Sequence, residues 1–521
     1  MAEQTGFLRG AVFLSAAVTV TKILGAAYKI PLANALGAGG MAHFYVAYNV
    51  YNACLLLFTA GIPTVLSRQT ACCRAMGQAA QERQNLKAAL LLLTVFSLGS
   101  GAALFLCPDR FAAALHDPAA AASIRALALS LACMGPIAAL RGYSQGRGDM
   151  KPTAVSQMLE SLCKLLLGLA LTAAALGQGA GEDRAAAAAL WGVSFGSVAA
   201  LLYLLARRPS FPSGRGTHVS FISSLSRLFQ AGLPITASAA GMSLITLLDQ
   251  TVFLHTLQSV LGYTPQAAAA AYGEYTFSAT LFALPPGILM TLSASLIPAI
   301  SRALAQHRER AASQNVHSAL SFCALLAFPM GIGLSVMAQP LLHLLYPAQP
   351  QAAQAAVCHL QVLGVASIFV CLTALTNGIL QAYRRERLGV LTLLCGGVVK
   401  IAATRILLSR PAIGIRGAAW GTLCCYALIF LLNVWMIARY TSARVSCFSA
   451  FLSPAAATVL MAMAAKSSYG WLSLRFSPVF SVLAAIVLAA AVYLLLLFSL
   501  GVFPASFSLS RLKNDHNLSF F

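Results

Sequence analysis

Charged residues are scarce in this chain of 521 residues, since Asp, Glu, Lys and Arg make up only 9% of it. Ordinary soluble proteins carry about a quarter. Polar stretches are also short, and none reaches the roughly 50 residues that a small globular domain needs. These absences exclude a water-soluble fold and a separate soluble domain. Hydrophobic residues make up 59% of the chain, so any function must be carried by apolar helices.

Acidic residues are few as well, with 13 Asp and Glu against 34 Lys and Arg. The basic residues lie between apolar runs, which is typical of cytoplasmic loops and not of a nucleic-acid-binding surface. The 13 cysteines form no C-x-x-C pair and have no His at ligand spacing, so we expect small core residues, with no metal and no cofactor. Only Arg9 precedes the first apolar run, which lacks a convincing signal cleavage site and is interpreted as a retained span.

The apolar runs predict an all-α polytopic membrane protein, because about 20 apolar residues in a helix cross the hydrocarbon core of a bilayer. We expect about fourteen spans. They lie near residues 9–35, 44–66, 88–107, 122–140, 153–176, 185–206, 228–255, 272–298, 316–338, 356–381, 388–408, 414–438, 448–465 and 478–500.

The distribution of Lys and Arg predicts the orientation. With fourteen spans, 22 of these residues fall on one side of the membrane and 7 on the other. The rest lie inside spans. Because cytoplasmic loops are the basic ones, we expect both termini in the cytoplasm.

The chain also resembles itself at a distance of about 235 residues. Gly142-x-x-Gln145 is followed by Lys164, and Gly378-x-x-Gln381 is followed at the same spacing by Lys400. This predicts two parallel six-helix lobes, a design that suits rocking around a central site. The expected division is an N-terminal lobe at 1–206, a linker at 207–227, a C-terminal lobe at 228–440, a helix pair at 448–500 and a cytoplasmic tail at 501–521.

Ionisable residues inside the membrane are costly and usually face a cavity or a partner. Lys22 and Lys29 are seven residues apart and share a helix face, so they predict a cationic stripe. Lys400 has no acid three or four positions away, and we assign it to the cavity. Glu160 and Lys164 are four apart and can pair with each other, or Lys164 can bind substrate.

Two further acids lie in predicted spans. Asp249 and Glu274 can bind a coupling cation or a cationic substrate. The alternative is that these acids form ion pairs with Lys22 or Lys400. The excess of cations within the spans favours an anionic substrate head group.

A set of motifs resembles the stage V sporulation protein B group of polysaccharide biosynthesis proteins. The group belongs, with the lipid II flippases, to the multidrug/oligosaccharidyl-lipid/polysaccharide exporter superfamily. The motifs are Phe7-Leu-Arg-Gly10, Lys22-Ile-Leu-Gly-Ala-Ala-Tyr-Lys-Ile-Pro-Leu32, Thr59-Ala-Gly-Ile-Pro63, Arg141-Gly-Tyr-Ser-Gln-Gly146, Lys151-Pro-Thr-Ala-Val-Ser-Gln157, Leu284-Pro-Pro-Gly287, Ile297-Pro-Ala-Ile-Ser301 and Thr376-Asn-Gly-Ile-Leu-Gln381.

The resemblance implies a carrier with an alternating-access cavity and a last helix pair beside a groove for a polyprenyl tail. The family's basic pair in the first helix carries over to Lys22 and Lys29. Known lipid II flippases have arginines where this chain has Leu55-Leu56, an acid where only His43 is near, and a basic residue about where Thr280 stands.

The expected function is therefore a flippase for an undecaprenyl-diphosphate-linked sugar, lipid II or a related lipid, serving cell wall, capsule or sporulation. Lys22, Lys29, Lys164 and Lys400 are the predicted substrate-binding residues. We expect a monomeric transporter and no enzyme, driven by membrane potential, H⁺ or Na⁺. The alternative is a cation-coupled multidrug exporter that uses Asp249 and Glu274. A membrane glycosyltransferase is disfavoured because no paired-carboxylate constellation faces one loop.

Overall fold

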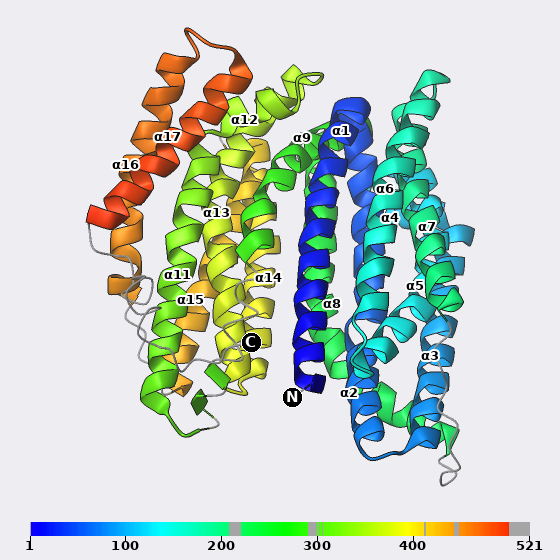
Figure 1. The fold of residues 1–521 in the computed structure, drawn as a ribbon. Helices are drawn as coiled ribbons and strands as arrows, with labels where there is room; N and C mark the ends of the chain where they lie inside the picture. Colours follow the sequence, from blue (N-terminus) through cyan, green and yellow to red (C-terminus); the bar gives the residue numbers. More distant parts are fainter. Residues whose placement is uncertain are drawn as a thin grey trace. The chain divides into compact units, whose positions relative to one another are not determined.

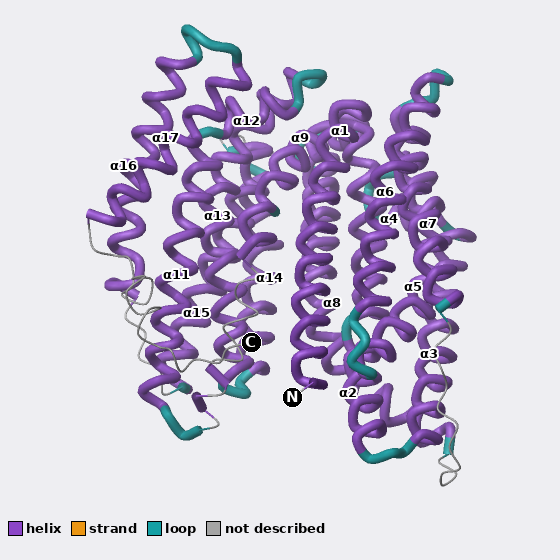
Figure 2. Tube along the Cα trace, in the orientation of Figure 1, coloured by secondary structure: helices purple, strands orange, loops and turns teal. Residues whose placement is uncertain are grey.

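A computed structural model describes residues 2–207, 220–289, 300–301, 303–304, 306–410, 413–441 and 447–499. Within these ranges the chain is helical with short connections and has no strand (Figure 2). The expected all-α class is therefore confirmed. The predicted cytoplasmic tail and most of the predicted linker at 207–227 lie outside the described residues.

The N-terminal helices are mostly long enough to cross a membrane (Figure 1). They are α1 (Ala2–Thr59), α2 (Gly61–Ala75), α3 (Ala79–Leu106), the short α4 (Pro108–Ala114), α5 (Ala121–Gly146), α6 (Lys151–Gly177), α7 (Glu182–Ala206), α8 (Phe221–Ser259) and α9 (Pro265–Phe282), with a 3₁₀ turn η1 at Pro118–Ala120. Proline in the first turn starts α4, η1 and α6, where its missing N–H costs nothing.

The C-terminal helices follow the same pattern. They are α11 (Glu309–Val336), the short α12 (Ala338–Leu345), α13 (Pro350–Ala382), α14 (Glu386–Leu408), α15 (Gly417–Tyr440), α16 (Cys447–Leu472) and α17 (Pro478–Ser499), with a 3₁₀ turn η2 at Gly414–Arg416. Helices α16 and α17 pack on each other, as expected of a terminal helix pair.

Ten helical stretches in the described part of the chain are long and apolar enough to cross a membrane. The protein is therefore a multi-pass membrane protein. The number fourteen stays a prediction. One of the ten stretches, Ala17–Ala75, covers both the first and the second predicted span.

Gly37 explains how one stretch covers two predicted spans. Its φ of 69° lies in the left-handed region, and the backbone there is not helical although α1 continues on both sides. Glycine reaches this conformation without the steric cost that a side chain adds. The first half of α1 runs from the N-terminus to this bend, and the second half runs back toward α2 (Figure 1).

The chain divides into two compact units. The first contains Met1–Thr276 and Thr404–Ile415, and the second contains Phe277–Ala403 and Arg416–Phe521. In the first unit α8, which begins the predicted C-terminal lobe, packs on α1, α2 and α3. The predicted division into lobes at residues 206 and 228 stays a prediction.

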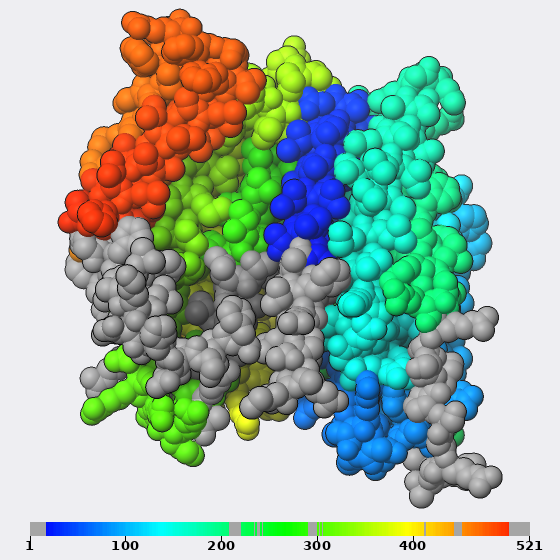
Figure 3. Space-filling view, in the orientation of Figure 1, coloured from blue at the N-terminus to red at the C-terminus, as the bar shows by residue number. Residues whose placement is uncertain are grey.

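Glycines allow the helices of each unit to approach closely. A Cβ on Gly192 of α7 would collide with the backbone of Gly168 on α6. In the second unit, a Cβ on Gly331 of α11 would lie 2.6 Å from the carbonyl oxygen of Gly364 on α13. Small residues at such crossings are the usual basis of helix association in membranes. In the first unit, the part of α1 drawn in dark blue lies directly against α6 in the space-filling view (Figure 3).

Candidate functional site

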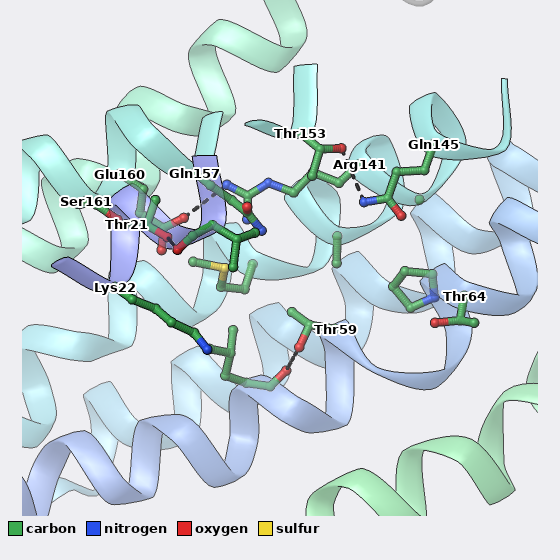
Figure 4. A pocket seen from close by; sticks show the side chains of 16 residues that line it. Thr21, Lys22, Thr59, Thr64, Arg141, Gln145, Thr153, Gln157, Glu160 and Ser161 are labelled. Carbon is green, nitrogen blue, oxygen red and sulfur yellow. Dashed lines mark hydrogen bonds and ion pairs between the residues drawn. The ribbon is translucent and has the colours of Figure 1, made fainter. Parts of the chain in front are cut away.

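A polar cavity of about 410 Å³ lies within the first unit among α1, α2, α5 and α6 (Figure 4). Its polar wall consists of Thr21, Lys22, Thr59, Thr64, Arg141, Gln145, Thr153, Gln157, Glu160 and Ser161. Its apolar wall consists of Val18, Leu55, Pro63, Met134, Ala138 and Gly142. The volume lies within the usual range of small-molecule sites.

The close approach of α2 to α5 positions one wall of this cavity. A Cβ on Gly142 would lie 2.7 Å from the carbonyl oxygen of Pro63, and one on Gly146 would collide with Ser67. Because both glycines lack a side chain, α2 packs directly on α5. Arg141, next to Gly142 in sequence, and Gln145, three residues after Gly142, thereby come to line the cavity (Figure 4).

Arg141 forms an ion pair across the cavity wall. Its Nη2 donates to Oε2 of Glu160 on α6 at 3.0 Å, and its Nε donates to Oγ of Ser156 at 2.9 Å. The side chains are mostly buried, with 13% of Arg141 and 21% of Glu160 exposed. These bonds occupy two of the five N–H donors of the guanidinium and fix its orientation. The guanidinium is thus held in place at the cavity wall.

Lys22 enters the same cavity from α1 and is exposed (Figure 4). Opposite it, Oε1 of Gln157 is buried and accepts no hydrogen bond from the residues that the structure describes. Two cations and one acid thus line the cavity. A ligand with negative charge and hydrogen-bonding groups fits this lining.

Two further predicted lysines meet at one tyrosine. Lys164 on α6 donates from Nζ to the hydroxyl of Tyr48 at 3.1 Å and lies 4.4 Å from the centre of its ring. Lys29 on α1 lies 5.8 Å from the same ring centre and 4.7 Å from that of Tyr45. Aromatic faces stabilise such cations. The helices α1 and α6 therefore carry a second cationic cluster, which we call the Tyr48 cluster, formed by Lys29, Lys164, Tyr45 and Tyr48.

Of the two alternatives for Glu160 and Lys164, the structure does not show the pair along α6. Glu160 pairs with Arg141 on α5, while Lys164 bonds to Tyr48 on α1. Each side chain has found a partner on a neighbouring helix. The one-turn spacing that predicts a Glu160–Lys164 pair is therefore not used for an ion pair among the described residues.

The remaining predicted residues lie elsewhere. Asp249 on α8 is buried and accepts a hydrogen bond at 2.6 Å from the hydroxyl of Thr404. Glu274 is half-buried on α9. Lys400 is 9% exposed on α14 and belongs to the second unit, so its convergence with Lys22 and Lys29 stays a prediction.

Arg141, Tyr48 and Gln157 were missed as site residues by the sequence analysis. Arg141 stands within the motif Arg141-Gly-Tyr-Ser-Gln-Gly146, but its position at a span end assigned it to a cytoplasmic loop. Its spacing of 19 residues from Glu160 crosses a helix connection, where helical periodicity carries no information. The signal that could find it is the pairing of motif residues at facing ends of consecutive spans.

Comparison with known proteins identifies the family. The family model described as polysaccharide biosynthesis protein matches residues 7–304, which is more than half of the chain. The chain belongs to this family. A second model, described as MatE, matches residues 242–404.

Individual relatives agree with the family assignment. The chain is 26% identical to stage V sporulation protein B of Bacillus subtilis over 95% of this chain and 96% of that protein. It is 24% identical to the lipid II flippase MurJ of the same species over 83% of this chain and 82% of that protein. The solved structure of an inward-facing multidrug resistance transporter of the MATE family, of the MOP superfamily, has a TM-score of 0.66 to this chain at 14% identity. The comparison covers 82% of this chain and 98% of that one. The family models and the curated relatives together make the chain a membrane transporter of the MOP superfamily.

Proposed function

We propose that the protein is an alternating-access flippase that moves an undecaprenyl-diphosphate-linked sugar, lipid II or a related lipid, from the inner to the outer leaflet of the bacterial cytoplasmic membrane. The observation that carries this proposal is the cavity with Lys22 and Arg141 in its wall. A diphosphate cannot cross hydrocarbon unaided, so a carrier must offer it a polar cavity with positive charge.

Arg141 and Lys22 suit two requirements of transport, which are to bind the diphosphate and to let it move. The guanidinium of Arg141 can bind phosphate oxygens through two parallel N–H groups, whereas Lys22 acts as a point charge that tolerates movement of the ligand. Lys29 lies seven residues, or about 10 Å, further along α1. Lys29 and Lys164, in the Tyr48 cluster, would be the next positive charges that the head group meets along α1. Lys400 would contribute from the second unit.

The membrane potential can drive this transport. Moving about two negative charges outward across an inside-negative membrane is favourable by roughly 4–5 kcal/mol per 100 mV. If the lysines neutralise the bound head group, the potential acts on the return of the empty carrier. Coupling to H⁺ or Na⁺ is the alternative, and neither drive requires a cofactor. In this account the protein works as a monomeric transporter and catalyses no covalent chemistry.

A second candidate function is a cation-coupled multidrug exporter. The match of the MatE model to residues 242–404 favours it, because this range contains Asp249 and Glu274. An exporter of organic cations needs an acidic cavity, however, and the cavity of the first unit carries more positive than negative side chains. We therefore place this function second.

Native mass spectrometry of the purified protein tests the proposal. We expect co-purified lipids with the mass of a polyprenyl diphosphate bearing a sugar, and their loss from the Arg141→Gln variant. A turnover assay with labelled lipid-linked sugar in vesicles then measures transport. Export of organic cations that stops with a proton or sodium uncoupler, together with no bound polyprenyl lipid, would reverse the order of the two candidates.

A further inference from the structure

A second cavity of about 300 Å³ in the first unit has a different chemistry from the first. It is lined by Asn49, Asn52, Leu55 and Leu56 of α1 and by Ser243 and Thr246 of α8. No lining residue is ionisable. Asn49 and Asn52 are one helical turn apart, as are Ser243 and Thr246. Amides from one helix thus face hydroxyls from another, which is a lining suited to an uncharged, hydroxyl-rich ligand.

Leu55 lines both cavities. It lies three residues after Asn52 of the neutral cavity and four residues before Thr59 of the charged one, so these side chains share a face of α1. Two cavities that share a wall residue can hold adjacent parts of one ligand. The charged cavity suits the diphosphate of the proposed substrate, and the neutral cavity offers a place for the group attached to that diphosphate.

Asn49 is held in place by buried partners behind the cavity. Its Nδ2 donates to Oε1 of Gln250 at 2.5 Å and to the hydroxyl of Tyr272 at 3.3 Å. The Tyr272 hydroxyl donates to the same Gln250 oxygen at 3.2 Å, and Gln250 is 2% exposed. This triangle fixes the orientation of the Asn49 amide at the cavity wall. A preoriented amide costs little entropy on binding.

We propose that this cavity is the sugar subsite of the transporter and that it selects a neutral sugar, with hydroxyl or acetamido groups, over a sugar that carries a carboxylate. The inference rests on the proposed function. An uncharged lining pairs with hydroxyls but gives no compensation for desolvating a carboxylate. Selectivity thus arises from the absence of a positive side chain at Leu55 and Leu56 as much as from the amides.

Binding of three lipids to the purified full-length protein tests the subsite. The probes are undecaprenyl diphosphate, the same lipid with one N-acetylhexosamine, and the same lipid with one uronic acid. We expect the neutral sugar to tighten binding about tenfold over the bare diphosphate, as one or two good hydrogen bonds would. The uronic acid should give no gain.

Variants assign this gain to the cavity. Asn52→Leu and Ser243→Ala should reduce the affinity for the neutral sugar lipid to that of the bare diphosphate and leave the bare lipid bound as before, which also shows that they fold. Thr251→Val is the matched control, because the Thr251 hydroxyl bonds to Leu247 O of its own helix and lines neither cavity. Leu56→Arg should shift the preference toward the uronic acid lipid.

The outcomes separate the two proposals. If no diphosphate lipid binds, the proposed function fails and the subsite fails with it. If the bare lipid binds but the neutral sugar adds nothing, or if Asn52→Leu weakens all three lipids equally, the subsite is wrong while the flippase proposal stands.

Discussion

Arg141 and Glu160 join α5 to α6 through an ion pair of 3.0 Å, and both side chains line the cavity that Lys22 also enters. The carboxylate of Glu160 therefore binds the same guanidinium of Arg141 that an anionic ligand would bind. In the proposed function, Glu160 would compete with the head group for Arg141. It also prevents an uncompensated positive charge from being buried when the cavity holds no ligand.

Substitutions at this pair should change the affinity for undecaprenyl diphosphate in opposite directions. Arg141→Gln removes a charge-assisted contact worth about 1.5–3 kcal/mol and should weaken binding roughly ten- to a hundredfold. Glu160→Gln removes the competing charge and should tighten binding. Titration calorimetry with the purified protein measures both. Arg147→Gln is the control, since Arg147 pairs with Glu82 outside the cavity at 3.8 Å. Equal affinities for the parent and both cavity variants would remove the pair from the site.

Two substitutions of Tyr48 should lower the free energy of unfolding by different amounts. Tyr48→Phe removes the charge-assisted hydrogen bond from Lys164 but keeps the ring, so it should cost about 1.5–3 kcal/mol. Tyr48→Leu also removes the aromatic face on which Lys29 and Lys164 lie, and should cost about 0.5–2 kcal/mol more. Unfolding in detergent measures both. A leucine variant as stable as the phenylalanine variant would show that the ring does not stabilise the lysines.

The connection between α4 and η1 should respond to acid. The His116 ring lies 4.8 Å from that of His255 on α8, and burial, together with the neighbouring His255, lowers the pKa of His116 from its usual 6.5. The adjacent Asp117 is paired with His43 at 2.7 Å. Because the folded state disfavours the protonated His116, its contribution to stability is lost as the pH falls below about 6.5.

The thermal unfolding midpoint of the parent should therefore fall between pH 7.5 and 5.5 by more than that of His116→Asn. Asparagine tolerates the positive φ of 59° at this position. His343→Asn is the control, because His343 and its partner Gln354 both belong to the second unit and His343 is exposed. Identical pH dependence in the parent and His116→Asn would contradict this role of His116.

Much of the fold could be predicted because the bilayer limits what a chain can do. A spanning segment must be a long apolar helix, so the run at 153–176 marks α6 within a few residues. The helices α4 and α12 were not predicted, because seven or eight residues are too few for a hydrophobic period. The bend at Gly37 depends on backbone conformation. In the sequence it is visible only as the gap between the predicted spans 9–35 and 44–66.

The site was predictable in part, for a related reason. Lys22, Lys29 and Lys164 could be found because an ionisable residue inside an apolar run is conspicuous by itself. Their partners could not be found, since Arg141 and Tyr48 meet these residues across helix interfaces. Pairing along one helix, as expected for Glu160 and Lys164, gave way to pairing between helices because the facing side chains are closer in the packed structure.

The central claim is that cationic side chains in the membrane carry a diphosphate head group, and flipping of lipid-linked sugar in reconstituted vesicles tests it most directly. Lys22→Gln, Lys29→Gln and Lys400→Gln should each lose flipping, and Arg at the same positions should restore part of it. Lys87→Gln is the control, since Lys87 is exposed on α3 and lines neither the charged nor the neutral cavity; it should flip at the parent rate. Flipping at the parent rate by all three glutamine variants would contradict the account and favour the exporter.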